Sequence, residues 1–272
     1  MEDVTVVVTG ASSGVGLAAA EEFARRGARV VVVGRDQARL AAAVEKVRDA
    51  GGGREPDRFQ ADFARLDDVH ALAAQLIDRY PKIDVLANNA GAVLASRRST
   101  VDGFEATIQG NHLAPFLLTN LLRERLRGGR VVNTASDAHR MGVVDPDDFA
   151  GTKTGYSSWR AYGASKAANI LFASEAGRRW PDILSTSYHP GVVRSGFGAG
   201  TLARVFYKVA APFLVSPEGG ADTLVWLATA PAGEVTQGGY YIKRKLATPA
   251  PAAADPERAA HLWEASAKAV GL

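Results

Sequence analysis

Short runs of β-branched residues alternate with longer Ala/Leu-rich stretches of helical periodicity along most of the chain. This alternation is typical of repeated βαβ units, and continuous Val/Ile runs are typical of parallel strands covered on both faces. The predicted strands are Val4–Thr9, Arg29–Val33, Arg58–Ala61, Ile83–Asn88, Arg130–Thr134, Leu184–Tyr188 and Tyr240–Ile242. The predicted helices are Gly16–Arg26, Gln37–Ala50, Leu66–Tyr80, Gly103–Arg127, Ser158–Trp180, Pro217–Thr229 and Pro256–Val270. We therefore expect an α/β fold with a Rossmann-type, doubly wound parallel sheet of about seven strands and helices on both faces.

No stretch of the sequence is typical of an interdomain linker, so residues 1–272 are predicted to form a single domain. The segment Ala247–Asp255 is predicted to be a short loop. Two connections, 137–157 and 192–216, are longer than the fold needs. Both follow a strand at the carboxyl edge, where open α/β sheets bind ligands. The second is rich in apolar residues and is predicted to be a lid over a lipophilic substrate or, alternatively, a satellite helix with a core face.

Composition excludes several classes of protein. The chain has 272 residues, of which 47% are hydrophobic and 22% charged, as in ordinary globular proteins. It contains no Cys, which excludes disulfides and thiolate sites and fits a reducing compartment, so we expect a cytoplasmic protein. The formal net charge of +3 does not indicate a nucleic-acid partner. Neither a signal peptide, a membrane span nor a metal-binding spacing of His residues is predicted.

A glycine-rich turn follows the first predicted strand and leads into a helix. It runs Thr9-Gly10-Ala11-Ser12-Ser13-Gly14-Val15-Gly16. Such a turn lets the backbone approach a pyrophosphate, whose charge is met by N–H groups at the start of the helix. The alternative is a tight strand–helix turn with no ligand.

The residues after the second strand indicate which nicotinamide cofactor the chain would bind. An NAD site places an acid there, but this chain has Gly34-Arg35-Asp36. The Arg35 guanidinium can bind a 2′-phosphate through charge-assisted hydrogen bonds, which favours NADP(H). Alternatively, Arg35 is a solvated turn residue. Asp36 is expected to cap the next helix.

Tyr162 and Lys166 are four residues apart in a predicted helix, so their side chains share one face. A neighbouring ammonium favours the phenolate of a tyrosine, which makes it usable as a general acid or base for a carbonyl–alcohol pair. Ser136 follows the fifth strand at the carboxyl edge, where its hydroxyl could bond the substrate oxygen. Taken separately, the Tyr–Lys spacing is also typical of pairs on a helix surface or in a packed core. Ser136 taken alone is typical of a turn residue.

Together the motifs resemble those of the short-chain dehydrogenases/reductases over nearly the whole chain. The resemblance rests on Thr9–Gly16, Asn88–Gly91, Asn111, Ser136, Tyr162–Lys166 and Pro190-Gly191. Within that family the chain resembles the retinol-dehydrogenase-like branch. The segments that carry this second resemblance are the long insert before Tyr162, Ser158–Tyr162, Ser165–Asn169, His189–Gly191 and Leu262-Trp263.

The resemblance implies four catalytic residues, Asn111, Ser136, Tyr162 and Lys166, with Asn111 holding a water in a proton path toward the lysine. The cofactor-binding residues that it implies are Gly10, Ser12, Ser13, Gly14, Val15, Gly16, Arg35, Asp62, Asn88, Ala90, Gly91, Tyr162, Lys166, Pro190, Gly191, Val192 and Ser195.

Three of the implied cofactor residues have alternatives. Asp62 would hold the adenine amino group, but it could instead cap a helix. Asn88 would lie at the cofactor, but it could instead form an Asx turn at the end of its strand. Ser195 stands where the family usually has Thr, and the backbone N–H of Val192 is a second candidate for the same contact to the nicotinamide carboxamide.

The sequence therefore predicts an NADP(H)-dependent oxidoreductase that interconverts a ketone or aldehyde and its alcohol, with a lipophilic small molecule as substrate. A non-catalytic NADP-binding sensor or scaffold and a reductase of an activated C=C bond are the alternatives. In many relatives the helices that correspond to Gly103–Arg127 and Ser158–Trp180 pack into dimers, so the resemblance also implies a homodimer.

Overall fold

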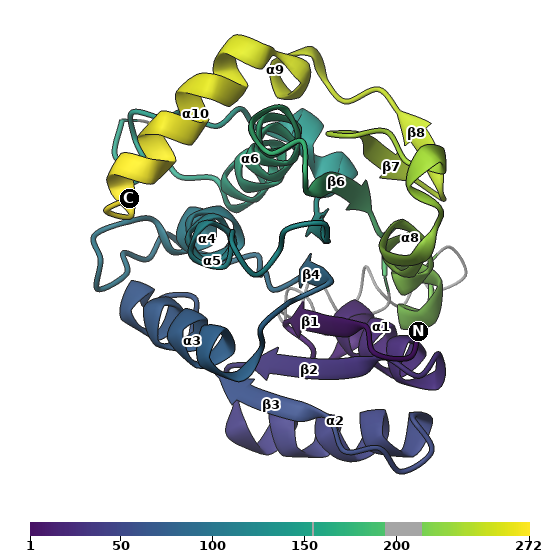
Figure 1. The fold of residues 1–272 in the computed structure, drawn as a ribbon. Coiled ribbons are helices and arrows are strands. Elements are labelled where there is room, and N and C mark those ends of the chain that lie inside the picture. The colour runs from purple at the N-terminus through teal and green to yellow at the C-terminus, as the bar shows by residue number, and fades with distance from the viewer. Residues whose placement is uncertain (154, 194–213) are drawn as a thin grey trace.

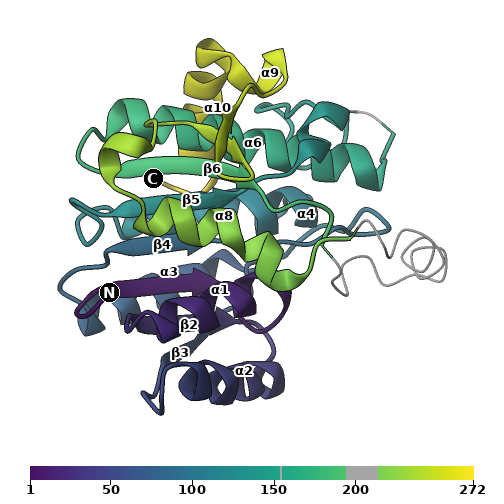
Figure 2. The same cartoon turned by 90° about the vertical axis from the view of Figure 1, so that its right-hand side faces the viewer.

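Among the residues that it describes, the computed structural model has a sheet of eight strands in the order β3-β2-β1-β4-β5-β6-β7-β8 (Figure 1). The structure describes residues 1–153, 155–193 and 214–272. Because β1 pairs with both β2 and β4, the chain winds outward from it in two directions. Figure 2 shows the strands from β3 to β6 one above another. The predicted doubly wound sheet is confirmed, and its switch point for ligands lies beyond the carboxyl ends of β1 and β4. The strands are β1 (Thr5–Thr9), β2 (Arg29–Gly34), β3 (Asp57–Gln60), β4 (Val85–Asn88), β5 (Arg130–Thr134), β6 (Leu184–His189), β7 (Tyr240–Ile242) and β8 (Lys245–Ala247).

Strand β8 adds one antiparallel strand to the edge of the predicted parallel sheet of about seven strands. It pairs antiparallel with β7 through a turn at Lys243 and Arg244. Both turn residues have positive φ angles, 51° and 62°, as the two central residues of a type I′ hairpin turn require. Asn and Gly are the usual signals for such a turn, so the Lys-Arg pair did not indicate it. The predicted loop Ala247–Asp255 is partly wrong, because it contains a short helix, α9 (Pro251–Ala254).

Helices cover both faces of the sheet (Figure 1). Side chains of successive residues in a strand point to opposite faces. Val6 and Val8 of β1 accordingly pack in one core, and Val7 packs in the other. The helices in the first core are α1 (Gly14–Arg25), α2 (Gln37–Ala50) and α8 (Pro217–Thr229). Those in the second are α3 (Leu66–Arg79), α5 (Ala114–Leu121), α6 (Ser158–Arg179) and α10 (Pro256–Ala269).

The predicted helix Gly103–Arg127 is shorter than expected and is not α-helical throughout. It begins with one turn of α-helix, α4 (Ala106–Ile108), passes through a π-helical turn, η1 (Gln109–Leu113), and resumes as α5. Helix α5 ends at Leu121, and turns follow. A π turn inserts one extra residue and is often found at functional sites. Here it contains Asn111, one of the predicted catalytic residues.

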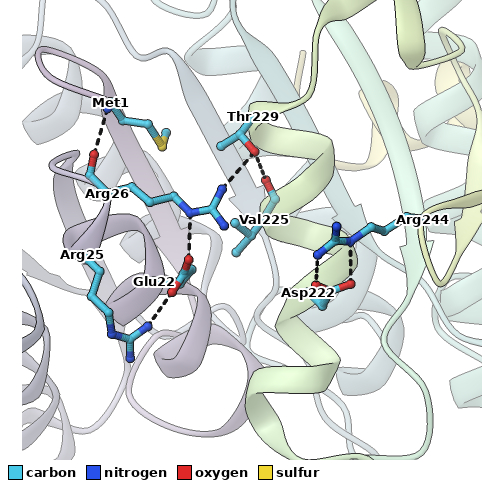
Figure 3. Close-up of polar contacts among 8 residues, drawn as sticks. All are labelled: Met1, Glu22, Arg25, Arg26, Asp222, Val225, Thr229 and Arg244. Carbon is cyan, nitrogen blue, oxygen red and sulfur yellow. Dashed lines mark hydrogen bonds and ion pairs between the residues drawn. The ribbon is translucent and has the colours of Figure 1, made fainter.

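Helix α8 is fixed between α1 and the β7–β8 hairpin (Figure 3). The amino group of Met1 donates a 2.8 Å hydrogen bond to the carbonyl oxygen of Arg26, just after α1. The guanidinium of Arg26 donates to Thr229 of α8 over 3.4 Å. At the hairpin, Arg244 forms an ion pair with Asp222 of α8.

The C-terminal helix α10 lies over the outer sides of α5 and α6 (Figure 1). The ring of Trp263 is 5.0 Å from that of Phe116 and 5.0 Å from that of Trp180, centroid to centroid. Ser266 Oγ lies 2.9 Å from Nε2 of the fully buried His112. The two helices that the resemblance assigns to a dimer contact are therefore packed against the chain's own last helix.

Candidate active site

Helix α1 begins at the carboxyl end of β1 without a capping side chain. Ser13 is its N-cap residue and makes no side-chain cap bond, and the first turn contains no acid. The free N–H groups and the positive end of the helix dipole favour an anion at this point. Gly10 and Gly14 have φ angles of +67° and +57°, which glycine adopts at little cost. The turn therefore fits a pyrophosphate.

The loop after β4 packs directly on this glycine turn. The hydroxyl of Thr9 accepts hydrogen bonds from the backbone N–H groups of Asn89 and Ala90, each 3.0 Å long. A Cβ atom on Gly10 would lie 2.8 Å from the Cα of Ala90. A side chain at position 10 would therefore push the two loops apart, which explains the glycine.

Asn88, at the end of β4, bonds into the core. Its Nδ2 donates to Thr119 Oγ1 over 2.9 Å and to Asn133 Oδ1 over 3.0 Å. Its buried Oδ1 has no hydrogen-bond partner. The Asx-turn alternative for Asn88 is therefore wrong, because such a turn needs this oxygen to accept a backbone N–H.

Arg35 and Asp62 lie side by side at the ends of β2 and β3. The Arg35 side chain is 75% exposed, and its Nη1 is 4.0 Å from Asp62 Oδ1. Asp36 caps α2 by accepting a 2.9 Å bond from a backbone N–H, as predicted. Asp62 does not cap α3, whose N-cap is Arg65; its Oδ1 accepts from the N–H of Ala64 in a turn. The helix-capping alternative for Asp62 is therefore wrong.

Lys166 is buried within α6 and anchored to the end of β5. Its Nζ donates a 2.9 Å hydrogen bond to the carbonyl oxygen of Thr134, and Asn169 Nδ2 donates to the same oxygen over 3.1 Å. The Nζ atom is 5.5 Å from the centre of the Tyr162 ring. Burial lowers the pKa of Lys166 to about 8, so the ammonium form is retained at neutral pH but only narrowly.

Asn111, in the π turn, joins the loop after β4 to helix α6. Its Oδ1 accepts from the N–H of Ala92 over 2.8 Å, and its Nδ2 donates to the carbonyl oxygen of Ala92 over 3.0 Å. The same Nδ2 donates to Ser165 Oγ over 2.9 Å, and Ser165 in turn donates to the carbonyl oxygen of Tyr162 over 2.7 Å. A Cβ atom on Gly91 would lie 3.1 Å from Asn111 Oδ1. Asn111, one of the four predicted catalytic residues, is thus held at both ends of its side-chain amide.

Ser136 begins a short 3-10 helix, η2 (Asp137–Met141), and its Oγ accepts from the N–H of Ala138 over 3.2 Å. Helix η2 packs against α6 at two glycines. A Cβ atom on Gly163 would lie 2.5 Å from the carbonyl oxygen of Ala138 and 2.9 Å from the amide nitrogen of Gly142. Because Gly163 directly follows Tyr162, this close approach of two backbones brings the serine segment against the tyrosine segment.

Two histidines bond to the same serine segment. His139 Nδ1 is 2.7 Å from the carbonyl oxygen of Ser136, and the N–H of Asp137 donates to His189 Nδ1 over 3.3 Å. Burial lowers the pKa of both imidazoles. Both histidines therefore form hydrogen bonds to the backbone around Ser136.

The segment after β6 approaches α8. A Cβ atom on Gly220 of α8 would lie 2.9 Å from Val15 and 2.8 Å from Val193. The N–H of Val215 donates to the carbonyl oxygen of Val192 over 2.9 Å, so the two ends of the predicted lid meet. Ser195 and most of the lid, 194–213, lie outside the described residues.

Comparison with known proteins identifies the family. The sequence model of the short chain dehydrogenase family matches residues 4–202.

The chain is a short-chain dehydrogenase.

Its relatives include carbonyl- and alcohol-acting members of the family. A protein of Streptomyces sp. (strain C5) assigned as a daunorubicin C-13 ketoreductase is 57% identical over 98% of this chain and 92% of its own. Retinol dehydrogenase 13 of Homo sapiens is 36% identical over 98% of this chain and 85% of its own. The chain therefore resembles the retinol dehydrogenase branch, as predicted.

Solved structures of similar proteins show the same fold. A crystal structure of a protein from Mycobacterium paratuberculosis has a TM-score of 0.81 and 32% identity, covering 99% of this chain and 94% of that one. A short chain dehydrogenase from Escherichia coli CFT073, complexed with NADPH, has a TM-score of 0.70 and 26% identity, covering 90% of this chain and 98% of that one.

Three groups at the site of this short-chain dehydrogenase were not predicted from the sequence. They are the Thr134 carbonyl, Ser165 and Asn169. Lys166 and Asn169 both donate to the carbonyl oxygen of Thr134, and Ser165 accepts from Asn111 and donates to the carbonyl oxygen of Tyr162. Ser165 and Asn169 follow Tyr162 by three and seven residues, the spacing of one helix face, which is a signal that the sequence contained. Within the described ranges, no helix has both the length and the apolar surface needed to span a membrane.

Proposed function

We propose that this short-chain dehydrogenase interconverts a ketone or aldehyde and its alcohol with NADP(H), and that Tyr162 is the general acid/base. The observation that carries the proposal is the convergence of three chain segments at the carboxyl edge: the π turn with Asn111, the end of β5 with Ser136, and α6 with Tyr162 and Lys166. Hydrogen bonds tie Lys166 to β5 and Asn111 to α6.

The residues at the switch point fit a dinucleotide. The uncapped start of α1 would hold the pyrophosphate, and Ala90 and Gly91 would leave room for the riboses. The exposed Arg35 would hold a 2′-phosphate, with Asp62 beside it at the adenine end. The NADPH complex of the Escherichia coli neighbour supports this choice of cofactor. Hydride chemistry is supplied by the nicotinamide ring when the cofactor is bound.

The chain's own residues handle the proton and the substrate oxygen. In the reducing direction the phenol of Tyr162 gives its proton to the oxygen of the carbonyl group, and in the oxidising direction its phenolate takes the proton of the alcohol. The Lys166 ammonium near the ring favours the phenolate. The hydroxyl of Ser136 donates a hydrogen bond to the same substrate oxygen and stabilises its developing charge.

Apolar side chains exposed around the site support a lipophilic substrate. Met141, at the end of η2, and Trp159, at the start of α6, are each 55% exposed, and Val192 is 56% exposed. The Trp159 ring lies 6.2 Å from the Tyr162 ring in an edge-to-face arrangement. Exposed apolar groups beside a catalytic group are typical of a pocket that binds apolar molecules.

The experiment is a panel of ketones, aldehydes and alcohols followed by NADPH absorbance, with the wild type, Tyr162→Phe and the distant control Tyr80→Phe. We expect carbonyl turnover by the wild type and the control, and a loss of about 1000-fold in kcat for Tyr162→Phe. Reduction of an activated C=C bond without carbonyl turnover would instead indicate that the protein is a reductase of such bonds. NADPH binding without any turnover would favour a sensor or scaffold.

A further inference from the structure

We propose that His139 is a positioning residue for Ser136, because its imidazole links the serine backbone to the segment that follows β8. The inference rests on the proposed function, in which the Ser136 hydroxyl bonds the substrate oxygen. It adds a residue that does not itself touch the substrate.

The two ring nitrogens of His139 have opposite partners. The N–H of Ala250 donates to Nε2 over 2.9 Å, so this nitrogen must be the acceptor. Nδ1 then carries the hydrogen and donates to the carbonyl oxygen of Ser136 over 2.7 Å. Only the neutral imidazole protonated on Nδ1 makes both bonds. The tautomer of His139 is therefore fixed by its neighbours.

The surroundings of His139 keep it neutral and immobile. The residue is 2% exposed, and its ring lies 5.3 Å from that of Tyr240 in β7, edge to face. Burial is the main cause that lowers the pKa of the imidazole, and Arg140 on the same turn acts in the same direction. The other titratable groups near the ring are Asp137 on the same turn and His189 on β6.

These bonds act on the catalytic serine rather than only on the fold. The carbonyl oxygen of Ser136 accepts from both the backbone N–H of His139, over 3.1 Å, and its imidazole, over 2.7 Å. The Ser136 hydroxyl accepts from the backbone N–H of Ala138, the residue before His139. Rotation of the peptide after Ser136 would move this hydroxyl, and a displacement of about 1 Å at a catalytic group can cost about 100-fold in rate.

Three variants separate the two bonds. In His139→Asn the amide nitrogen takes the place of Nδ1 and keeps the donor to Ser136, but the acceptor for Ala250 is lost. In His139→Gln the amide oxygen can reach the position of Nε2, and the donor to Ser136 is lost. His139→Phe keeps the ring packing on Tyr240 and loses both bonds. Arg140→Ala is the matched control, because Arg140 bonds Thr248 in the same C-terminal segment without contacting Ser136.

We expect kcat for carbonyl reduction to fall about 10- to 100-fold in His139→Gln and His139→Phe and to stay within about threefold of wild type in His139→Asn and Arg140→Ala. The dissociation constant for NADPH should stay within about twofold in all four variants, since the glycine turn is remote. Equal kcat values for His139→Asn and His139→Gln would overturn the proposal, as would a loss of activity that follows melting temperature alone.

A second measurement does not depend on turnover. Hydrogen exchange at the amides of Ala138 and His139 should accelerate in His139→Gln and His139→Phe but not in His139→Asn. If the wild type shows no carbonyl activity, the proposed function fails. Unchanged exchange at these amides in all three variants would instead overturn the positioning role, whatever the reaction is.

Discussion

The Nζ atom of Lys166 donates its hydrogen bond to the carbonyl oxygen of Thr134, two residues before Ser136, over 2.9 Å. One short piece of β5 therefore anchors the lysine and leads directly to the serine. Asn169 shares the same acceptor, so α6 is joined to β5 by two donors. Lys166 sits in a buried place, where its charge is costly unless such an acceptor is present.

The lowered pKa of Lys166 predicts a loss of activity in mild alkali. Because burial lowers this pKa to about 8, the ammonium form is lost as the pH rises through that value. We expect kcat/KM for carbonyl reduction, which reports the free enzyme, to fall above about pH 8. Lys166→Arg keeps its charge throughout, so its residual kcat/KM should not show this fall. A flat wild-type profile between pH 7 and 9 would contradict the prediction.

A methyl group at position 163 should damage both stability and catalysis. In Gly163→Ala the new Cβ would lie 2.5 Å from the carbonyl oxygen of Ala138, so η2 must move and carry Ser136 with it. We expect a loss of about 1–3 kcal/mol in the free energy of unfolding and a reduced kcat. Gly233→Ala is the control, because nothing lies within 4 Å of its Cβ position. Urea unfolding and steady-state kinetics measure both effects, and a Gly163→Ala enzyme equal to this control would show that the close approach is unimportant.

Arg35 should determine the choice between NADPH and NADH. Arg35→Ala removes the guanidinium from the end of β2, so we expect KM for NADPH to rise about tenfold or more and KM for NADH to change little. Arg39→Ala, in the first turn of α2, removes a nearby positive charge as the control and should leave the ratio of the two KM values unchanged. Equal effects of Arg35→Ala on the two cofactors would exclude a role for Arg35 at the 2′-phosphate.

His112 should make the protein less stable in acid. Burial lowers its pKa to about 4, so between pH 7 and 4 the unfolded chain takes up a proton that the folded chain does not. Stability is fully present above the ordinary pKa of histidine and is lost as the pH falls toward 4. From pH 7 to 5 the loss is about 2 kcal/mol.

The double variant His112→Leu/Ser266→Ala tests this effect, because it removes both hydrogen-bond partners and leaves neither unpaired. We expect its free energy of unfolding to fall less steeply between pH 7 and 5 than that of the wild type. His261→Leu, at the surface, is the matched control and should keep the wild-type slope. Parallel slopes for all three proteins would refute the assignment to His112.

Hydrophobic periodicity predicted most of the fold because the parallel strands are covered on both faces and contain uninterrupted Val runs such as Val6–Val8. The pattern did not predict β8, since an exposed edge strand such as Lys245–Ala247 has no buried face to impose a period. Nor did it predict the π turn. That turn depends on the bonds of Asn111 to Ala92 and Ser165, which are remote in sequence.

The candidate site was predictable where chemistry is carried by side chains in motifs, as for Tyr162 and Lys166. It was not predictable where a backbone group is the hydrogen-bond partner of a site residue. The acceptor of Lys166 is the carbonyl group of Thr134, which any residue could supply, and the bond between His139 and Ala250 joins segments 111 residues apart. Such pairings depend on tertiary packing rather than on residue type or local spacing.

Helix α10 has a consequence for shortened versions of the chain. Its Trp263 shields the rings of Phe116 in α5, Phe172 in α6 and Trp180 directly after α6. A chain that ends at residue 254 would lack α10, and these aromatic rings would then be exposed to water as an apolar surface patch. Such a fragment would retain every residue of the proposed catalytic centre, yet it would precipitate or self-associate in the test tube, and its failure would say nothing against the chemistry.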